Sequence, residues 1–412
     1  MPSLADHAVI PGSAPPAPEL EAAWALLEQA VTLEPASAEV HAARANLLVR
    51  RGKLDLARRS YALAARFDPY GAPVRLALGE LAFMAGEPAV AEGWFDEAFA
   101  LARVYSPSAR PGARSALVLA LPGPWHRNVP LDFVVDPARW TLHRYYLAPG
   151  TSRSPIVLPA YDLVIDAIGA CVDAGPALAA AERFVAGQTK PVVNDPRRVA
   201  GTARDALAAT LAGIAGCTVA PVRRLTRDEL PGADLTVPLL VRPTDAHGGR
   251  DLERVDDAAA LAEYARRVPA ASYDAGPFVD YRSADGFYRK YRVMFVDGAA
   301  YAYHLAIDAN WMIHYHRAPM AEHAWMRAEE ERFLTAPGKA LACRPGVLRD
   351  VAAAIGLDYA GIDCTVLADG TLLVFEADAA MLVHDFDPQP AKRAAYGRIR
   401  GALDALLARR AG

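Results

Sequence analysis

The segment 361–380, GIDCTVLADGTLLVFEADAA, combines the pattern of a β-hairpin with three carboxylates. The β-prone runs CTVL and TLLVFE flank ADG, which is a turn signal. Glu376 and Asp378 are two residues apart, so on a strand their side chains share one face, and Asp363 on the opposing strand can reach that face. Such carboxylates repel each other unless they are solvated or a hard cation neutralises them. Mg²⁺ would do so and would complete its shell with water and substrate phosphates.

A second candidate site lies in the segment 238–257, PLLVRPTDAHGGRDLERVDD. A predicted strand ends near Arg242, and His247, Gly248 and Gly249 then form a flexible turn whose backbone N–H groups could approach a phosphate. No Gly-Lys-Ser/Thr follows, so the turn is not a Walker A loop, and it does not match a dinucleotide fingerprint. Taken alone, the segment is more simply an ordinary connection between a strand and a helix.

The composition is that of a globular protein. The chain has 412 residues, of which 53% are hydrophobic and 22% are charged, enough for several domains. The net charge of −4 gives no reason to expect nucleic acid as a partner. The cysteines have no metal-type spacing, and we expect them to be reduced and mostly buried. We find no signal-peptide pattern and no run of about 18 apolar residues, and therefore expect a cytoplasmic protein with no membrane association.

The first hundred residues are predicted to be helical and repetitive. The segments 38–71 and 72–105 align with a period of 34 residues, so that Gly52 matches Gly86. The pattern resembles tetratricopeptide repeats, which have a small residue at the helix crossing, a glycine at the turn and a closing proline. Two interpretations stay open. The repeats are either a helical cap packed on the next domain or a docking surface for a partner protein or peptide.

Beyond the repeats the pattern changes to alternating strands and helices. Short apolar strands at 116–123, 162–170 and 190–196, with a helix over 175–187, predict a small parallel sheet. Further along we expect a helix over 198–216, a strand over 218–225, a hairpin that turns at Asp297-Gly298, a helix over 345–356 and a last helix over 390–410.

The order of these pieces over about residues 120–385 resembles the ATP-grasp superfamily, specifically the glutathione-synthetase-like carboxylate–amine ligases. VVNDPRRV is similar to the Asn-x-Pro stretch that closes the family's first domain, and TARD stands where the family has a cation that contacts ATP. LLVRP is similar to the family's Val-Val-Lys-Pro strand, HGG to its lid loop, and PFVDY to the hinge that brackets adenine. YRKYRVMFVDG resembles its Arg-bearing hairpin, and GIDCTVLADGTLLVFEAD its metal-binding strands.

The resemblance implies an α+β and α/β architecture with all-α repeats followed by an ATP-grasp fold, in which two α+β subdomains sandwich ATP. The expected division is a disordered segment 1–18, helical repeats 19–110, an α/β domain 111–197 and an ATP-grasp domain 198–412, with its lid at about 217–280 and its metal-binding part at about 281–412.

The resemblance also implies roles for individual residues. Asp363, Glu376 and Asp378 match the ligands of Mg²⁺, with Mn²⁺ as an alternative metal. The residues that match nucleotide contacts are Arg204 and Arg242 (cations), His247, Gly248 and Gly249 (lid loop), Val279 and Asp280 (adenine hinge), and Lys290 (ribose or phosphates). Arg292 matches the position that steadies the acyl phosphate, with Arg242 as the second catalytic cation. The family has lysine at position 242 and asparagine at 378, and both replacements keep the required charge or ligand type.

Other polar residues are weaker candidates. His304, Asn310, Trp311 and His314 are interpreted as substrate-pocket residues; a zinc site at His314 and His316 is disfavoured because no Cys or Asp completes it. His126 and Arg127 follow the first α/β strand, where open sheets place ligands, so they are candidate substrate contacts. The run MRAEEERF (326–333) is predicted to be a solvated helix face.

Three functions fit these patterns. The leading hypothesis is an ATP-dependent ligase that activates a carboxylate as an acyl phosphate and joins it to an amine, with small-molecule or peptide substrates. The second is a related enzyme with a non-amine acceptor. The third is a scaffold in which the repeats bind a partner and the remaining fold only binds nucleotide. Homodimerisation through the repeats is a further hypothesis, and the sequence does not identify the substrates.

Overall fold

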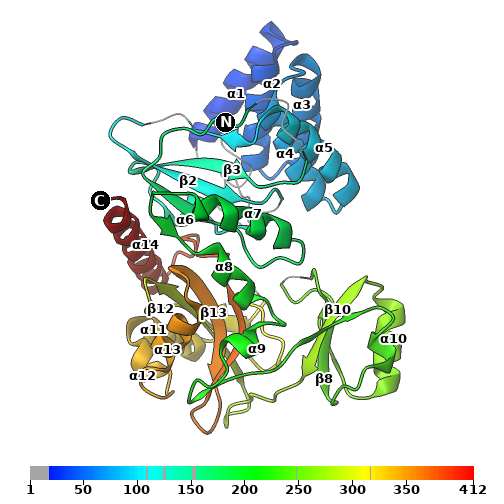
Figure 1. The fold of residues 1–412 in the computed structure, drawn as a ribbon, viewed down its shortest axis with the longest axis vertical. Coiled ribbons are helices and arrows are strands. Elements are labelled where there is room, and N and C mark those ends of the chain that lie inside the picture. Colours follow the sequence, from blue (N-terminus) through cyan, green and yellow to red (C-terminus); the bar gives the residue numbers. More distant parts are fainter. Residues whose placement is uncertain (1–17, 108–109, 124–126, 151–154, 247, 316) are drawn as a thin grey trace. The chain divides into compact units, whose positions relative to one another are not determined.

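The computed structural model describes residues 18–107, 110–123, 127–150, 155–246, 248–315 and 317–412. The chain divides into two compact units. The first comprises the described residues up to Ile168 together with Ala179–Val192 and Ala411, and the second comprises Gly169–Leu178, Val193–Arg410 and Gly412. Figure 1 labels the helices and strands of both units.

The first unit starts with helices that form two similar hairpins. The helices are α1 (Pro18–Leu33), α2 (Ala38–Arg50), α3 (Leu54–Phe67), α4 (Ala72–Met84) and α5 (Pro88–Leu101). The hairpins α2–α3 and α4–α5 turn at Gly52 and Gly86, whose φ angles of 67° and 76° favour glycine. The predicted helical repetition is therefore confirmed, whereas the assignment to tetratricopeptide repeats stays a prediction.

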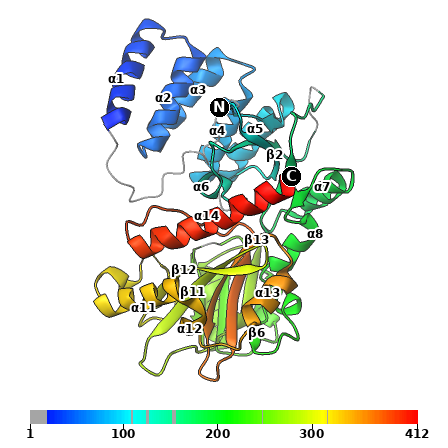
Figure 2. The same ribbon diagram turned by 90° about the vertical axis from the view of Figure 1, so that its left-hand side faces the viewer.

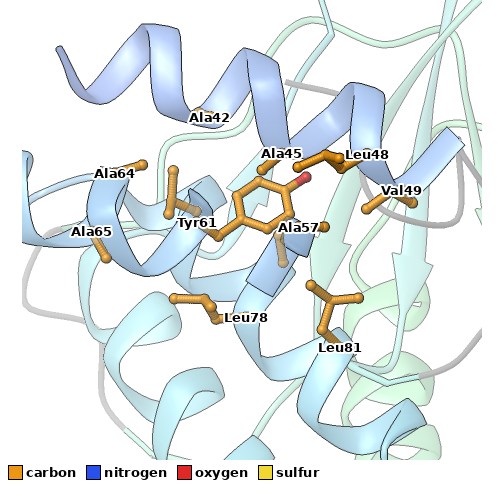
Figure 3. Close-up of a cluster of buried hydrophobic side chains, with 12 residues drawn as sticks. Ala42, Ala45, Leu48, Val49, Ala57, Tyr61, Ala64, Ala65, Leu78 and Leu81 are labelled. Atoms are coloured by element: carbon orange, nitrogen blue, oxygen red, sulfur yellow. The ribbon is translucent and has the colours of Figure 1, made fainter. Parts of the chain in front are cut away.

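Close helix crossings explain the small and aromatic residues of the repeat. Tyr61 is 1% exposed and its ring lies among buried side chains of α2, α3 and α4 (Figure 3). Its hydroxyl donates to the side-chain oxygen of Asn46 at 2.5 Å. In the next hairpin, a Cβ added to Gly79 would lie 2.5 Å from the ring of Phe95, so only glycine allows α4 and α5 to approach this closely.

The second helical hairpin shares a core with the sheet of the same unit. Leu76 and Ala82 of α4 and Phe99 of α5 pack in one buried cluster with Ala120 and Tyr146 of the strands. This shared core is what the interpretation as a helical cap expects.

The sheet of the first unit is largely parallel. The strands and helices of this region are β1 (Val104–Tyr105), β2 (Arg114–Ala120), α6 (Leu131–Val134), β3 (Trp140–Tyr146), β4 (Leu163–Asp166), α7 (Gly175–Ala186) and β5 (Val192–Val193). The division between the two units falls within α7 and within β5. The strand order is β1-β3-β2-β4-β5, and β2 pairs in parallel with both β3 and β4. The predicted parallel sheet is confirmed, although β3 was not among the predicted strands.

The segment that follows β5 differs from the prediction. Instead of one helix over 198–216 it contains α8 (Pro196–Val199), a 3₁₀ turn η3 (Ala200–Thr202) and α9 (Leu207–Thr210). The helix is interrupted at Ala203, whose ψ of 145° is extended. The Thr210 hydroxyl donates to the carbonyl of Gly201 at 2.9 Å, which holds the two short pieces together.

The second unit contains a four-stranded antiparallel sheet. Its elements are β7 (Arg223–Thr226), η4 (Leu230–Gly232), β8 (Leu239–Pro243), β9 (Glu253–Val255), α10 (Ala258–Arg267) and β10 (Ser272–Pro277), in the order β7-β10-β8-β9. The strand predicted over 218–225 is in fact two strands, because β6 (Cys217–Val219) belongs to another sheet. Pro221, which has no N–H to donate to a ladder, lies at the break.

The other sheet of this unit has five strands in the order β12-β11-β13-β14-β6. The remaining elements are β11 (Tyr288–Val296), β12 (Ala299–Asp308), η5 (Pro319–Ala321), α11 (Ala324–Thr335), α12 (Pro337–Ala340), α13 (Val347–Ile355), β13 (Tyr359–Val366), β14 (Leu372–Asp378) and α14 (Pro390–Ala411). Figure 2 shows α11 to α14 around this sheet. Both predicted hairpins, β11–β12 and β13–β14, are confirmed as antiparallel pairs.

Three expectations about burial and environment can be compared with the structure. The run 326–333 is not a solvated face, because Met326, Glu330 and Phe333 are buried. Of the cysteines only Cys364 is buried, and the other three are half-buried free thiols. Within the described ranges, no helix combines the length and the apolar character needed to span a membrane.

Candidate active site

A row of polar side chains crosses four strands of the five-stranded sheet. In the ladder register, Arg292 on β11 lies opposite His304 on β12 and opposite Asp363 on β13, and Asp363 lies opposite Glu376 on β14. Directly opposed residues carry their side chains on the same face of a sheet. The strand pairing thus gathers onto one face residues that are more than 80 positions apart in the sequence.

Asp363 is the buried centre of this row, with 1% of its side chain exposed. Arg292 binds both of its oxygens, Nε to Oδ1 at 2.7 Å and Nη2 to Oδ2 at 3.0 Å, and Nζ of Lys290 lies 3.1 Å from Oδ2. Burial by itself would raise the pKa of the carboxyl, but the charges of Arg292 and Lys290 hold that pKa well below its usual range. Asp363 is therefore ionised and fixes the directions of two cations.

Glu376 and Asp378 form the acidic end of the row. Both are half-buried, and among the described residues neither forms an ion pair. Burial raises the pKa of Asp378 to about 6, the charge of Glu376 adds to this rise, and the N–H of Ala380, which donates to Oδ1 at 2.7 Å, opposes it. Two adjacent carboxylates without a cationic partner are a donor set that fits Mg²⁺, which binds few protein oxygens.

Asp363 differs from these two acids because its carboxylate is already bound by two cations. Within the described part of the chain, no group of three His, Cys, Asp or Glu side chains is arranged to hold a metal ion. This agrees with the engagement of Asp363 by Arg292 and Lys290. The predicted metal role of Asp363, Glu376 and Asp378 stays a prediction.

An apolar, aromatic cluster adjoins the polar row. Ala306, which lies opposite Lys290 in the ladder, belongs to it. Its buried members are Tyr281, Tyr288, Ala306, Ile313 and Leu373, and Val279, Trp311 and Phe375 pack against them. The Tyr281 and Phe375 rings are 4.8 Å apart, and the Tyr281 hydroxyl donates to the Trp311 carbonyl. Of the predicted hinge residues, Val279 thus packs on the cluster, whereas Asp280 is exposed.

Arginines gather around a second buried aspartate in the four-stranded sheet. Asp274 on β10 is 3% exposed, and its oxygens lie 3.3 Å from Nη1 of Arg204 and 3.2 Å from Nε of Arg224. Arg242 on β8 lies opposite Asp274 in the ladder but donates instead to the carbonyl of Ala246 at 2.5 Å. Sequence reasoning missed Arg224 and Asp274, because only the cross-strand pairing brings them to the two predicted arginines.

This arginine cluster carries more positive charge than its acids offset. Asp205, 3.3 Å from Arg224, is the other acid that contacts it. Nε of Arg242 and the hydroxyl of Thr244 are buried and have no hydrogen-bond partner among the described residues. Buried polar groups are normally paired, so these two atoms at the end of β8 mark a place where a polar ligand fits.

Arg204 connects the two charged regions. Its guanidinium donates to the carbonyls of Thr244 and Ala246, each at 3.1 Å, at the end of β8. Its charge also acts on Asp378, where it opposes the burial that raises the pKa of that carboxyl. The arginine cluster and the acidic end of the row are therefore electrostatically coupled within one unit.

The glycine turn lies against the loop that follows β12. Gly248 and Gly249 have φ angles of 63° and 75°, which side-chain-bearing residues rarely adopt. A Cβ on Gly248 would lie 3.6 Å from Nε2 of His314, and one on Gly249 would lie 3.8 Å from Sδ of Met312. His247 lies outside the described residues.

The weaker candidates are of two kinds, those near the polar row and those in the first unit. His304 lies in the row, and Trp311 packs against the aromatic cluster beside it. Burial lowers the pKa of His304 well below 6.5, and the charge of Arg292 lowers it further. Asn310 is exposed and accepts the N–H of Met312 at 3.0 Å within its own loop. In the first unit, Arg127 is buried with its guanidinium 5.8 Å from the Phe83 ring, and its substrate role stays a prediction. His126 and His316 lie outside the described residues.

Comparisons with known proteins give only distant similarities. No family model matches the chain, and no curated protein matches it. Among solved structures, the chain is similar to a RimK domain protein ATP-grasp from Sphaerobacter thermophilus (14% identity, TM-score 0.40, 71% of this chain and 99% of that chain). It is also similar to the VanG D-Ala:D-Ser ligase from Enterococcus faecalis (12% identity, TM-score 0.43, 71% of this chain and 99% of that chain). A third similar structure is the L-amino acid ligase from Bacillus licheniformis (16% identity, TM-score 0.35, 65% of this chain and 67% of that chain).

Proposed function

We propose that the second unit binds Mg·ATP and that the protein is an ATP-dependent ligase of the ATP-grasp type, which joins a carboxylate to an amine. The observation that carries this proposal is the adjacency of three kinds of surface: an aromatic cluster, a cationic cluster and a pair of unpaired acids. A nucleotide has a flat apolar base, a polyanionic phosphate chain and a requirement for a divalent cation. Few other small ligands need all three surfaces together.

Glu376 and Asp378 would hold the divalent cation, while Asp363 keeps its contacts with Arg292 and Lys290. When bound, the cation offsets charge on the phosphate oxygens and orients them. Arg204 and Arg242, which lie at the four-stranded sheet, would bind the phosphates. The Nε of Arg242, which has no partner among the described residues, offers a donor for them. The aromatic cluster with Trp311 would receive the base.

The chemistry asked of these residues is charge stabilisation. A carboxylate oxygen attacks the γ-phosphorus of ATP, the bond to ADP breaks, and an acyl phosphate forms. The amine nitrogen then attacks the acyl carbon, phosphate leaves, and the nitrogen loses a proton. Both steps build negative charge on phosphoryl or acyl oxygens, which Arg292 and Lys290, held in place by Asp363, would stabilise.

The acyl phosphate must be protected from water. The glycine turn at Gly248 and Gly249, packed beside Met312 and His314, has the backbone freedom and the position for a lid over the phosphates. A closed lid would exclude water, so that attack by the amine, which forms the amide, outcompetes hydrolysis of the acyl phosphate.

The test is ADP release by the full chain with Mg·ATP and pooled common amino acids, with mass spectrometry to detect a new amide. We expect ADP and an amide to accumulate together, and Glu376→Gln to abolish both. ADP release without any organic product, or with equal rates in the variant, would contradict the ligase proposal.

A further inference from the structure

Lys392 is a buried cation outside the proposed nucleotide contacts. It lies in the first turn of α14 with 7% of its side chain exposed. Its Nζ is 2.8 Å from Oδ2 of Asp387, 3.4 Å from Oε1 of Glu330 and 3.6 Å from the centre of the Tyr315 ring. One ammonium thus holds an acid from α11, an acid from the segment 379–389 and an aromatic ring from the loop after β12.

The partners of Lys392 reach the polar row. Oε1 of Glu330 also accepts the N–H of Leu305 on the edge strand β12 at 3.1 Å. The Tyr315 ring is 4.5 Å from the ring of His304, which is the ladder partner of Arg292. Through Tyr315 and His304, the cluster around Lys392 is therefore continuous with the residues proposed to stabilise the acyl phosphate.

The segment 379–389 is attached at a second point. The Tyr303 hydroxyl accepts the N–H of His384 at 2.8 Å and donates to its carbonyl at 3.1 Å. Since this segment directly follows Asp378, its position is tied to the acidic end of the row. Lys392 and Tyr303 together fix both the middle and the end of the segment.

A buried ionic cluster is a costly way to fasten a helix. Burial raises the pKa of Glu330 to about 8 and lowers the pKa of Lys392 to about 7. Oε2 of Glu330 has no hydrogen-bond partner among the described residues. Apolar residues of similar volume often stabilise such sites more, so the cluster is better explained by the geometry that it imposes than by stability alone.

We propose that Lys392 is a positioning residue for the acceptor side of the site: its ammonium holds Tyr315 and Asp387 so that the loop 309–315 and the segment 379–389 form a wall beside His304 and Arg292. That this wall binds the amine substrate rests on the proposed ligase function. That Lys392 holds the two segments in place does not depend on that function.

Hydrogen exchange of the full chain, measured by mass spectrometry, tests the fastening directly. In Lys392→Met we expect exchange in 309–315 and 379–389 to rise about tenfold, because a buried ion pair is broken, with little change in the first unit. The matched control is Arg398→Ala, which removes the 2.7 Å hydrogen bond from Arg398 to the Leu334 carbonyl. It loosens the same two helices, α14 and α11, without touching Tyr315, and should leave both segments protected.

A pH profile separates positioning by charge from simple packing. The groups that face Lys392 are Glu330, Asp387 and Tyr315, and the charge of Lys392 also acts on His304. Because burial lowers the pKa of Lys392 to about 7, the open state holds a proton at higher pH that the closed state has released, and linkage then favours the closed state as the pH rises. Protection of 379–389 in the wild type, corrected for intrinsic rates, should therefore rise relative to Lys392→Met from about pH 7 to about pH 9, while Glu330 contributes equally to both proteins. Equal protection in wild type and Lys392→Met, or a difference between them that does not change with pH, would overturn the proposal.

Calorimetry of Mg·ATP binding keeps this test separate from the proposed function. Lys392→Met should bind Mg·ATP within about twofold of the wild type, since Lys392 contacts none of the proposed phosphate or metal residues. If the wild type binds no nucleotide, the ligase proposal fails while the exchange data still decide whether Lys392 fastens the two segments. A tenfold loss of nucleotide binding in Lys392→Met would contradict its assignment to the acceptor side.

Discussion

Asp274 and Asp363 are both buried aspartates of the second unit, and each lies between cations from neighbouring strands. They differ in how completely they are bound. One arginine fork occupies both oxygens of Asp363 and a lysine adds a third contact, whereas Arg204 and Arg224 each make one longer contact to Asp274. A bidentate pair fixes the directions of its cations more firmly than two single contacts do.

The charge around the two aspartates has opposite signs. Beside Asp363, Glu376 and Asp378 add acids that no described cation pairs with, so this end is negative. Beside Asp274, Arg242 adds a cation that lies opposite the acid yet does not pair with it, so this end is positive. The comparison teaches that one sheet is arranged to receive anionic groups and the other to receive a cation, which is the polarity that Mg·ATP requires.

Replacing each aspartate with asparagine should give the largest difference between the two sites, measured as a loss in the free energy of unfolding. Asp363→Asn leaves Arg292 and Lys290 without their buried partner, and we expect the free energy of unfolding to fall by about 3–5 kcal/mol. Asp274→Asn should cost less, about 1–2 kcal/mol, since Arg204 and Arg224 each make a single longer contact to Asp274 and keep other partners, the carbonyls of Thr244 and Ala246 and the carboxylate of Asp205. Urea unfolding of both variants measures the difference, and equal losses would break the comparison.

Arg242 should affect ligand binding more than stability. Arg242→Met loses one hydrogen bond, to an Ala246 carbonyl that Arg204 also donates to, so it should remove little folding energy. It should weaken Mg·ATP binding by about ten- to hundredfold, because the Nε that would donate to the ligand is lost. Calorimetry and thermal unfolding of the same sample measure both quantities. A variant that binds normally but unfolds earlier would show that Arg242 is structural.

The aromatic cluster should matter for the base and not for the phosphates. Trp311→Ala should weaken ATP binding by about tenfold, the loss expected for one stacking partner, and should leave the binding of inorganic tripolyphosphate unchanged. Competition between the two ligands provides the measurement. Equal weakening of both would indicate a general loss of structure.

His304 should give the smallest effect, a change in pH dependence. Its folded pKa is lowered well below 6.5, so the unfolded chain takes up a proton as pH falls through about 6.5 and the folded chain does not. The wild type should therefore lose stability below that pH by up to about 1.4 kcal/mol per pH unit more than His304→Gln. Denaturant unfolding at a series of pH values measures this difference, and parallel profiles would contradict a neutral buried imidazole.

Local patterns predicted much of the second unit. The hairpin turn at Asp297-Gly298 has φ angles of 52° and 75°, and the acidic hairpin forms with Asp363 opposite Glu376, both as the turn signals and the two-residue spacing require. The prediction of one helix over 198–216 was wrong, because helical propensity did not reveal the extended residue at Ala203. The prediction of a single strand over 218–225 was also wrong, because the chain breaks at Pro221 and passes from the sheet of β6 to the sheet of β7.

Long-range pairings were out of reach. The contact of Lys290 with Asp363 depends on the β11–β13 register, whereas the predicted roles were nucleotide binding for Lys290 and metal binding for Asp363. Glu330 looked like one acid of a charged helix face, and only its position beside Leu305 and Lys392 reveals it as buried. Residues whose surroundings come from one strand and its turn were foreseen, whereas those defined by a third element were not.

Calorimetric titration of Mg·ATP into the full chain and into Glu376→Gln tests the central claim most directly. The account predicts binding by the wild type with a Kd of about 1–100 μM, equivalent to about 5.5–8 kcal/mol, and an affinity at least about tenfold lower in the variant, in which one of the two unpaired acids is lost. A wild type that binds no nucleotide, or a variant that binds as tightly as the wild type, would contradict the assignment of Glu376 and Asp378 to a metal–nucleotide site.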